Sequence, residues 1–478
     1  MSLHAAVDLG AASGRVMLGD VQAGRLRLVE TARFSNAAVE VPTADRPALY
    51  WDVLSLWRHS IGGLTRVAEL AGGEAVLSIA VATWAIDYGL LDASGALLGN
   101  PRCYRDPRTD GVAEELHRRV PAERLYQRNG LQHLPFTTLY QLIAEQQESS
   151  LRGAETLLLL PDLFGYWLCG HRGAEATNVS TTGLADVRTG RWAPDLVELA
   201  GVDAAVLPPV HDPGAQLGPL REELRERTGL DRATVTAVGS HDTASAVVAV
   251  PAADERFAYI VCGTWALVGV ELMEAVLTPA SLAAGFTNER GVDDRIRYLH
   301  NVMGLWVLQG CLADWGEPAS ALPRLLAGAG QLPTGGPFID LDDAAFLAPG
   351  PMVTRVLGAC QRSGSPLPAD GGPDGRARVV RCVLDSLAAA FASSIEAVVD
   401  LSGRDVDVVH LVGGGARNEL LCQLTATACG RPVLAGPVEA TALGNVLVQA
   451  RAAGTVRGSL EDLRALVRNT HQLVRYEP

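Results

Sequence analysis

The stretch AVDLGAASGRVMLGD, residues 6–20, reads as a strand, a tight turn and a second strand. A third strand-like run at 25–34 extends it, so the start of the chain predicts a meander of two hairpins. A helical pattern over 51–70 follows, and then a continuous apolar run at 75–83 that is typical of a buried central strand. Three antiparallel strands, a helix and a further strand predict an α/β layer rather than an all-β fold.

The same plan recurs later in the chain. FAYIVCGTWALVGVEL, residues 257–272, again reads as strand, small-residue turn and strand, and residues 406–437 read as a βαβ unit with a glycine-rich turn. We therefore interpret the chain as an internal duplication with a break near residues 245–256. A further hairpin is predicted over 87–98, and the proline- and glycine-rich stretch 328–375 is expected to be surface loop.

The composition of the 478 residues excludes several classes of protein. All 40 basic residues are arginine, so the lysines of Walker A loops, protein kinases and Schiff-base enzymes are absent. A net charge of −14 argues against nucleic acid and anionic membranes as main partners. The uncharged stretch 257–270 is too short to cross a bilayer, and the N-terminus shows no signal-peptide pattern. Eight cysteines without a CxxC pair indicate reduced thiols and a cytoplasmic location.

The first turn can hold a phosphate group without a lysine. The backbone N–H groups of residues 10–14 surround the bend, and such a concavity can bind an anion. Arg15 supplies a permanent charge for phosphate oxygens, and Asp8 is a candidate ligand for hydrated Mg²⁺. The alternative is an ordinary glycine-rich hairpin with a solvent-exposed arginine.

A second candidate site lies in GSHDTASAV, residues 239–247. His241 and Asp242 follow an apolar strand and precede a small-residue helical run, and strand ends are where α/β folds bind ligands. Asp242 is ionised at neutral pH, so it can accept a proton from a substrate hydroxyl. The alternative is that Asp242 caps the helix.

Three further segments are candidates for binding. VGGGARNE, residues 412–419, places three glycines between a strand and a helix, where a ligand can approach the backbone, although the dinucleotide fingerprint is absent. Trp84 and Asp87 follow the buried strand, and an aromatic face with an acid can hold a sugar. YRDPRTDG, residues 104–111, is dense in polar groups, and its alternative is a salt-bridged loop that starts a helix.

Taken in order, these segments resemble the FGGY carbohydrate kinases over about residues 5–470. The matching motifs are AVDLGAASGRVML, WAIDYGLLD, YRDPRTDG, PDLFGYWLCG, TNVSTTGLADVRTGRW, GSHDTASAV, CGTWALVG, NVMGLWVLQ and GPVEATALGN. HDTASAV together with NVMGLW and GPVEA is specific to the branch that acts on L-rhamnulose. The resemblance implies an α/β fold of two ribonuclease H-like (actin-like ATPase) lobes with a cleft between them. The predicted lobes are residues 1–248, for the sugar and phosphates, and residues 249–478, for ATP.

The resemblance also implies a reaction and its residues. The γ-phosphoryl group of MgATP is expected to move to the 1-hydroxyl of L-rhamnulose, with Asp242 as catalytic base. The expected sugar-binding residues are Ala85, His241, Asp242 and Thr243, joined by Trp84 and Asp87 from the residue pattern. The expected ATP-binding residues are Ala11, Ala12, Ser13, Gly14, Arg15, Thr264, Asn301, Gln309, Gly413, Gly414 and Gly415, with Asp8 as the metal ligand.

Two positions depart from the family pattern. Ala12 stands where a serine is usual, which removes one hydroxyl contact to phosphate, and Ala85 stands where a glycine is usual, which can shift the sugar preference. One alternative is therefore a kinase for L-fuculose, xylulose or another ketose. Two further alternatives are a non-enzymatic actin-like sensor of sugar or ATP and a structural, partner-binding protein. The expected partners are the small-molecule sugar and ATP, and the sequence leaves the oligomeric state open.

Overall fold

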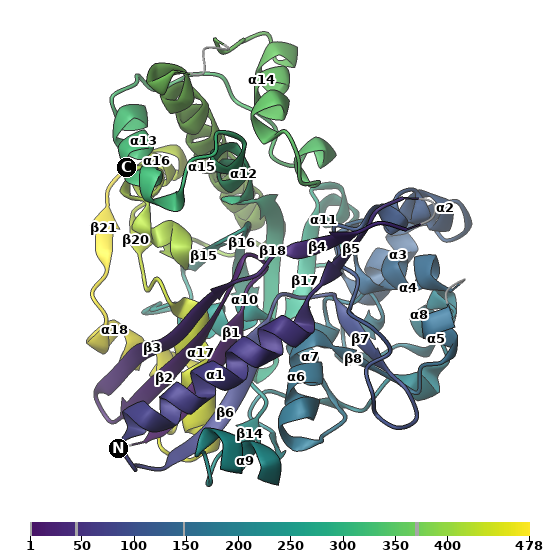
Figure 1. Cartoon of the computed structure of the whole chain (residues 1–478). Helices are drawn as coiled ribbons and strands as arrows, with labels where there is room; N and C mark the ends of the chain where they lie inside the picture. Colours follow the sequence, from purple (N-terminus) through teal and green to yellow (C-terminus); the bar gives the residue numbers. More distant parts are fainter. Residues whose placement is uncertain (1, 44–45, 147–148, 369–371) are drawn as a thin grey trace. The chain divides into compact units, whose positions relative to one another are not determined.

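The computed structural model describes residues 2–43, 46–146, 149–368 and 372–478 (Figure 1). Its backbone contacts divide the chain into two compact units, each discontinuous in sequence. Unit 1 comprises Met1–Ala253, Glu271–Tyr298 and Glu439–His471, and unit 2 comprises Asp254–Val270, Leu299–Val438 and Gln472–Pro478. The division into lobes 1–248 and 249–478 remains a prediction.

The main sheet of unit 1 confirms the predicted meander. Its strand order is β13-β14-β6-β1-β2-β3, where β1 pairs antiparallel with β2, β2 antiparallel with β3, and β1 parallel with β6. The strands are β1 (Leu3–Leu9), β2 (Ser13–Gln22), β3 (Arg25–Ser35), β6 (Val76–Thr83), β13 (Gln216–Pro219) and β14 (Thr234–Thr236). The apolar run at 75–83 is therefore the central strand that its composition predicts.

Helices cover both faces of this sheet (Figure 1). Helix α1 (Val53–Ala71) begins after Asp52, whose side chain accepts from the backbone N–H of Ser55. A Cβ built on Gly63 of α1 would lie 2.5 Å from Val16, and one built on Gly19 would lie 2.5 Å from Val446 of α17 (Ala440–Ala452). Because Val16 and Gly19 point to opposite faces of β2, α1 and α17 pack on opposite sides, and the two glycines let them approach closely.

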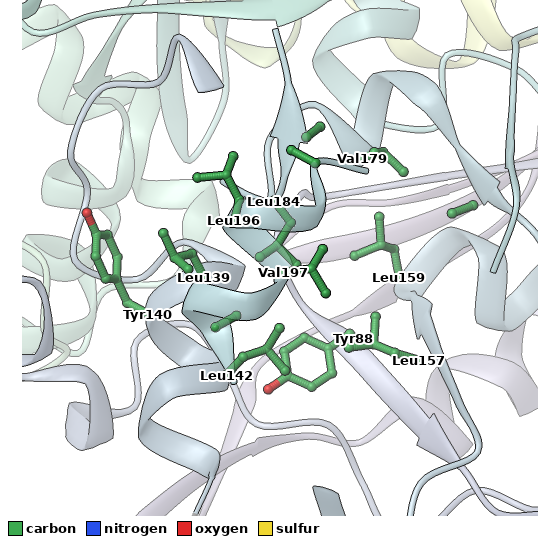
Figure 2. Packing of buried hydrophobic residues seen from close by; sticks show 14 of the residues in the cluster. Tyr88, Leu139, Tyr140, Leu142, Leu157, Leu159, Val179, Leu184, Leu196 and Val197 are labelled. Atoms are coloured by element: carbon green, nitrogen blue, oxygen red, sulfur yellow. The ribbon is translucent and has the colours of Figure 1, made fainter. Parts of the chain in front are cut away.

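A second core in unit 1 surrounds β7 (Tyr88–Leu91) and β8 (Thr156–Leu159), which pair antiparallel. Figure 2 shows Tyr88, Leu157 and Leu159 of these strands packed with side chains of α4 (Thr138–Glu145) and α8 (Pro194–Ala200). The predicted hairpin over 87–98 is confirmed as a short one: Leu91 and Leu97 form an antiparallel bridge, Leu98 N–H donates to Leu90 O and Asp92 N–H donates to Ala96 O, both at 2.9 Å. The longer pairing of β7 is with the leucine-rich β8, which offers it more apolar surface to bury.

The remaining elements of unit 1 are shorter. They are β4 (Ala38–Val41), β5 (Ala48–Trp51), α2 (Val112–Arg119), α3 (Ala122–Asn129), α5 (Ser149–Arg152), α6 (Leu160–Cys169), β9 (Ala174–Glu175), α7 (Ala176–Val179), β10 (Ala185–Asp186), β11 (Arg191–Trp192), β12 (Val210–His211), α9 (Glu222–Thr228), α10 (Asp242–Val248), α11 (Pro279–Ala283), β17 (Phe286–Arg290) and α18 (Leu460–Thr470).

The sheet that includes the strands of unit 2 repeats the plan of the first. The order β18-β16-β15-β19-β20 matches β3-β2-β1-β6-β14, with the same antiparallel and parallel pairs at its centre, so the predicted duplication is confirmed. The elements are β15 (Phe257–Cys262), β16 (Trp265–Leu272), β18 (Ile296–Met303), β19 (Val408–Val412), α16 (Glu419–Cys429), β20 (Val433–Ala435) and β21 (Val474–Tyr476). The segment β19–α16–β20 is the predicted βαβ unit.

The stretch 328–375 is not the surface loop that its prolines and glycines suggest. It contains α14 (Met352–Arg362), and Phe346, Met352 and Val356 are fully buried. A Cβ on Gly310 of α12 (Trp306–Asp314) would lie 2.9 Å from Met352, so α14 packs directly on that helix. The apolar side chains outweigh the turn-forming composition; residues 369–371 of the stretch lie outside the described residues.

Helix α15 (Pro373–Ser402) is the one helix in the described parts of the chain that is long and apolar enough to cross a membrane. Of its apolar window, 67% is buried inside the structure, as in the core helix of a globular unit. Helix α13 (Leu322–Gly330) packs against it.

Candidate active site

The segment that carries His241 and Asp242 is fixed at the carboxyl end of the central strand β6. Thr83, the last residue of β6, forms a parallel bridge with His241, and its N–H donates to Ser240 O at 2.9 Å. The amide and the hydroxyl of Ser240 both donate to Glu175 Oε2, at 2.9 and 2.7 Å. Glu175 is only 1% exposed, so this loop is anchored to a buried carboxylate.

Asp242 is the first residue of α10, and the N-cap residue is His241. The alternative that Asp242 caps the helix is therefore wrong. Its side chain is 29% exposed, and Oδ1 accepts from Thr243 Oγ1 at 3.1 Å and lies 3.5 Å from His241 Nε2. Desolvation raises the pKa of Asp242, although His241 and Thr243 oppose the shift. The result is an accessible carboxylate with a raised affinity for a proton.

A buried charge cluster lies around the first turn. Asp8 pairs with Arg15 in the β1–β2 register, and Arg15 Nη1 lies 3.9 Å from Asp8 Oδ2 and forms an ion pair with Glu439. Burial raises the pKa of Asp8 to about 7, with Arg15 opposing and with Asp242 and Glu439 adding to the shift. Arg15 is thus held by carboxylates, unlike the free surface arginine of the alternative reading.

Asn36 occupies two carbonyl groups of the first turn, while the described residues offer no backbone acceptor to two of its N–H groups. Asn36 donates from Nδ2 to Gly10 O at 2.9 Å and from its backbone to Ala12 O at 3.0 Å. Among the described residues, no backbone carbonyl accepts from the N–H of Ala11 or Ala12. A Cβ on Gly14 would collide with the ring of Phe34, which explains the glycine there. The turn therefore presents amide donors, as an anion requires.

A metal ion at Asp8 would need further ligands from outside the protein, such as phosphate oxygens and water. Within the described ranges, no cluster of three His, Cys, Asp or Glu side chains is arranged to hold an ion by itself. Mg²⁺ in phosphate-transferring sites takes one or two carboxylates and completes its shell with phosphates and water. A cation would also relieve the unfavourable burial of the Asp8 carboxylate. Asp8 is thus compatible with Mg²⁺ that arrives with a phosphorylated substrate.

Trp84 and Asp87 are brought together, but Asp87 is not open to solvent. Asp87 Oδ2 accepts from Trp51 Nε1 at 2.6 Å and from Trp84 Nε1 at 2.9 Å, and Oδ1 accepts from Gln141 Nε2 at 3.0 Å. The residue is 1% exposed, and burial raises its pKa to about 6, although the donors oppose the shift. The carboxylate therefore orients the two indoles.

The residues between Trp84 and Asp87 form a strained turn. Asp87 N–H donates to Ala85 O at 2.9 Å, and the intervening Ile86 has a φ of 70°. A β-branched residue with positive φ is rare, and three-residue turns of this kind are strained. The surrounding contacts hold it, because Thr138 Oγ1 donates to Ile86 O at 2.7 Å. Such strain is concentrated at functional sites, and it lies beside Ala85, the predicted sugar contact.

Two site residues were missed by the sequence reasoning. Arg297 of β18 is fully buried, and its Nη2 lies 3.1 Å from His241 Nδ1 and 2.9 Å from Glu289 Oε2. Burial by itself would raise the pKa of Glu289, but Arg297 and His241 outweigh it and leave the pKa below its usual range. The available signal was an acid and a base placed inside two strand-like runs, where apolar residues are the norm.

In unit 2, Thr264 lies in the turn between β15 and β16. Gly263 N–H donates to Trp265 O at 2.8 Å, and the start of α12 holds the turn, since Trp306 N–H donates to Thr264 O at 3.2 Å. Asn301 lies in β18, and Gln309 is exposed on α12.

The glycine triplet of unit 2 follows β19, the parallel neighbour of β15. Gly413 has a φ of 84°, and a Cβ there would lie 3.1 Å from Cys262 O. A Cβ on Gly415 would lie 2.5 Å from Cys262 Sγ, whereas the nearest atom to one on Gly414 is 4.0 Å away. Two of the three glycines are therefore required by close packing against Cys262, and Gly414 is the one that leaves room for a ligand.

The polar segment 104–111 has a structural explanation. Asp106 caps the short helix at Pro107–Thr109 by accepting from Arg108 N–H, and it lies 3.3 Å from Arg102 Nη1. This is the salt-bridged loop of the alternative reading.

Comparisons with known proteins show the family of the chain. Residues 3–249 match the N-terminal domain model of the FGGY family of carbohydrate kinases, and residues 258–453 match its C-terminal domain model. A rhamnulokinase of Bacteroides thetaiotaomicron is 39% identical over 475 residues, which cover 99% of this chain and 95% of the relative. A rhamnulokinase of Bacillus subtilis is 36% identical over 476 residues, with coverages of 100% and 95%.

Among solved structures, the xylulose kinase of Lactobacillus acidophilus superposes with a TM-score of 0.79 at 15% identity, covering 100% of this chain and 94% of that one. At this identity the likeness concerns the fold. The predicted α/β fold with two ribonuclease H-like sheets, as in actin-like ATPases, is confirmed.

Proposed function

Because the chain belongs to the FGGY family of carbohydrate kinases, which use ATP, we propose that it phosphorylates the 1-hydroxyl of L-rhamnulose. The product is L-rhamnulose 1-phosphate. The choice of sugar is supported by the rhamnulokinases, which are 39% and 36% identical over almost the whole chain. The observation that carries the chemistry is the partly exposed Asp242 carboxylate at the end of the central strand.

Asp242 is the proposed catalytic base. Its Oδ1 accepts from Thr243 and faces His241, so Oδ2 is the proposed acceptor for the proton of the sugar 1-hydroxyl. The hydroxyl oxygen forms the new bond to the γ-phosphorus, the bond from that phosphorus to the bridging oxygen breaks, and ADP leaves. Desolvation raises the pKa of Asp242, and this favours proton acceptance over that of an aspartate in water.

The proposed sugar site is formed around the end of β6. Trp84, which is 6% exposed and packs on Trp51, is the proposed wall of this site. The strained turn offers the backbone of Ala85, and the buried His241 and Thr243 offer polar groups next to the base. Asp87 belongs to the same proposed site and acts through Trp84, because both of its oxygens already accept from indole or amide donors.

The proposed ATP contacts are the residues that the family resemblance implies. In unit 1 they are the N–H groups of Ala11, Ala12, Ser13 and Gly14 and the guanidinium of Arg15. In unit 2 they are Thr264, Asn301, Gln309 and Gly413–Gly415, with Gly414 the glycine that leaves space for a ligand. Mg²⁺, held through Asp8, neutralises phosphate charge when it is bound. The amides and Arg15 then do the work that a lysine does in other phosphate loops.

We further propose that residues 1–248 form the sugar- and phosphate-binding lobe, that residues 249–478 form the ATP-binding lobe, and that the protein acts in the cytoplasm. All eight cysteines are free thiols, which suits a reducing compartment. The proposed partners are the sugar and ATP, since a net charge of −14 disfavours nucleic acid and anionic membranes.

The test is a coupled ADP-release assay with MgATP on L-rhamnulose, L-fuculose and xylulose. The highest kcat/KM is expected for L-rhamnulose, with the product identified as the 1-phosphate by ³¹P NMR. A higher kcat/KM for another ketose would mean that the protein is a kinase for that ketose and not for L-rhamnulose. ATP and sugar binding in calorimetry, with no sugar-dependent ADP release, would instead indicate a sensor.

Ala85 is the observation that favours a second candidate, a kinase for a related ketose. It is partly exposed in the strained turn beside the proposed base, and a methyl group there narrows the space for a sugar. Ala85→Gly is expected to leave L-rhamnulose as the preferred sugar. A reversal of the substrate ranking in this variant would mean that Ala85 sets the specificity.

A further inference from the structure

A buried arginine and glutamate lie behind His241, away from its contact with Asp242. Arg297 Nη2 lies 3.1 Å from His241 Nδ1 and 2.9 Å from Glu289 Oε2, and Arg297 Nε donates to Arg290 O at 3.0 Å. Arg297 is fully buried, and the side chains of His241 and Glu289 are 8% and 7% exposed. The three side chains come from the N-cap position of α10, from β17 and from β18, and all belong to unit 1.

These contacts determine where the imidazole carries its hydrogen. A guanidinium can only donate, so the contact from Arg297 requires His241 Nδ1 to accept and the ring hydrogen to sit on Nε2. Glu289 Oε2 lies 3.3 Å from Nδ1 but, among the described residues, has no partner with hydrogen-bond geometry. A hydrogen on Nδ1 would point at the guanidinium, so the neutral Nε2–H form fits the shorter contact, from Arg297, whose Nη2 also lies between the imidazole and Glu289 at 2.9 Å from Oε2.

The arrangement is costly as a purely structural device. Arg297 Nη1 is buried and finds no hydrogen-bond partner in the described parts of the chain. A buried ion pair is often no more stabilising than apolar side chains of the same volume, and an unpartnered buried donor costs more. A role in the reaction accounts for a cost that folding does not require.

Resting on the proposed function, we propose that Arg297 is a positioning residue for phosphoryl transfer, and that Glu289 keeps it in place. Arg297 holds His241 with its hydrogen on Nε2, which lies 3.5 Å from Asp242 Oδ1. That hydrogen keeps Oδ1 turned toward the imidazole and leaves Oδ2 toward the sugar. In the other tautomer a lone pair would face the carboxylate, and the repulsion would turn the base away.

The first arm of the test is kinetic. In Arg297→Lys the positive charge beside Glu289 stays, but the ammonium ends one bond short of the Nη2 position, so the contact to His241 is lost. We expect kcat to fall about 10- to 100-fold, the effect of losing one charge-assisted hydrogen bond, while the sugar KM changes less than about threefold. Arg464→Lys is the matched control, because Arg464 is a buried arginine paired with Glu271 in the same unit. It should keep the parent kcat.

The second arm uses the parent protein without substrate. ¹⁵N NMR of histidine-labelled protein, with His241 assigned by its loss in His241→Asn, is expected to show a hydrogen on Nε2 and a bare Nδ1. A hydrogen on Nδ1 would overturn the proposal, whether or not Nε2 also carries one. An unchanged kcat in Arg297→Lys would overturn it as well. Should Arg297→Lys not fold, the NMR result decides alone.

The two proposals fail separately. If no sugar is phosphorylated, the proposed function fails and the tautomer still reports on Arg297. If L-rhamnulose is phosphorylated while His241 carries its hydrogen on Nδ1, only the role of Arg297 is lost.

Discussion

The turn between β1 and β2 and the turn between β15 and β16 occupy equivalent places in two copies of one sheet, yet they are built differently. The first is surrounded by charge: Asp8, Arg15 and Glu439 lie within one network, close to Asp242. The second is surrounded by close-packed backbone, in which a Cβ on Gly304 would lie 2.6 Å from the carbonyl carbon of Trp265.

We propose that the two copies serve different parts of the proposed reaction. Charged groups with shifted pKa values can accept a proton or neutralise the charge of a phosphate group. Asp8 and Asp242, whose pKa values are raised, lie near the first turn in unit 1. Around the second turn, Gly304 and Gly413 pack closely against backbone atoms, and a backbone surface without side chains suits a bound nucleoside. Substitutions in the first region should therefore change chemistry, and those in the second should change packing and nucleotide affinity.

The largest effect is expected from Asp242→Asn. The amide keeps the size of the side chain but cannot take the hydroxyl proton, so kcat should fall about 10²- to 10⁴-fold. The melting temperature should stay near that of the parent, because the carboxylate is partly exposed. A folded variant that phosphorylates sugar at the parent rate would show that Asp242 is not the catalytic base. The proposed difference between the two regions would then be wrong.

The glycine triplet of the second region offers a matched pair. Gly415→Ala should destabilise the protein by about 1–3 kcal/mol, because its Cβ would lie 2.5 Å from Cys262 Sγ. Gly414→Ala should leave the melting temperature unchanged, because its Cβ meets nothing closer than 4.0 Å, and should raise the KM for ATP. Equal effects of both variants on stability and KM would contradict the division between packing and binding at these positions.

Asp87→Asn tests whether that residue acts through the indoles. An amide nitrogen would face either the indole donors or Gln141 Nε2, so one buried contact is lost at a cost of about 1–3 kcal/mol. Where the indole of Trp84 loses its acceptor, its ring is no longer held in place. The KM for the sugar should then rise more than the KM for ATP. The exposed Asp110 serves as the control, with Asp110→Asn expected to change neither.

The smallest effect is expected from Glu439→Gln. Glu439 neutralises Arg15 in the absence of substrate, so its removal should free the guanidinium for phosphate and lower the KM for ATP a few-fold. The measurement is the ATP dependence of initial rate at saturating sugar. A higher KM would mean that the carboxylate itself serves ATP binding, and the charge network would need a different reading.

Much of the fold was predictable because it depends on local patterns. Strand alternation, the glycines of the first turn and the apolar run at 75–83 identified the meander and the central strand. The likeness of 6–20 to 257–272 revealed the duplication. The short hairpin at 87–98 was also predictable, but the pairing of β7 with β8 was not, because it depends on a leucine-rich segment more than 60 residues away.

By itself, the sequence determined that this is a duplicated α/β chain without lysine, with Asp8 and Asp242 close to strand ends. Hydrophobic periodicity and turn-forming residues act over a few positions, so a short segment of sequence is enough to recognise them. Only the tertiary structure decided which side chains meet: Glu439 reaches Arg15 across 424 positions, and Arg297 reaches His241 across 56. Those pairs depend on how strands and helices pack, because a buried charge takes whichever partner the fold brings within reach.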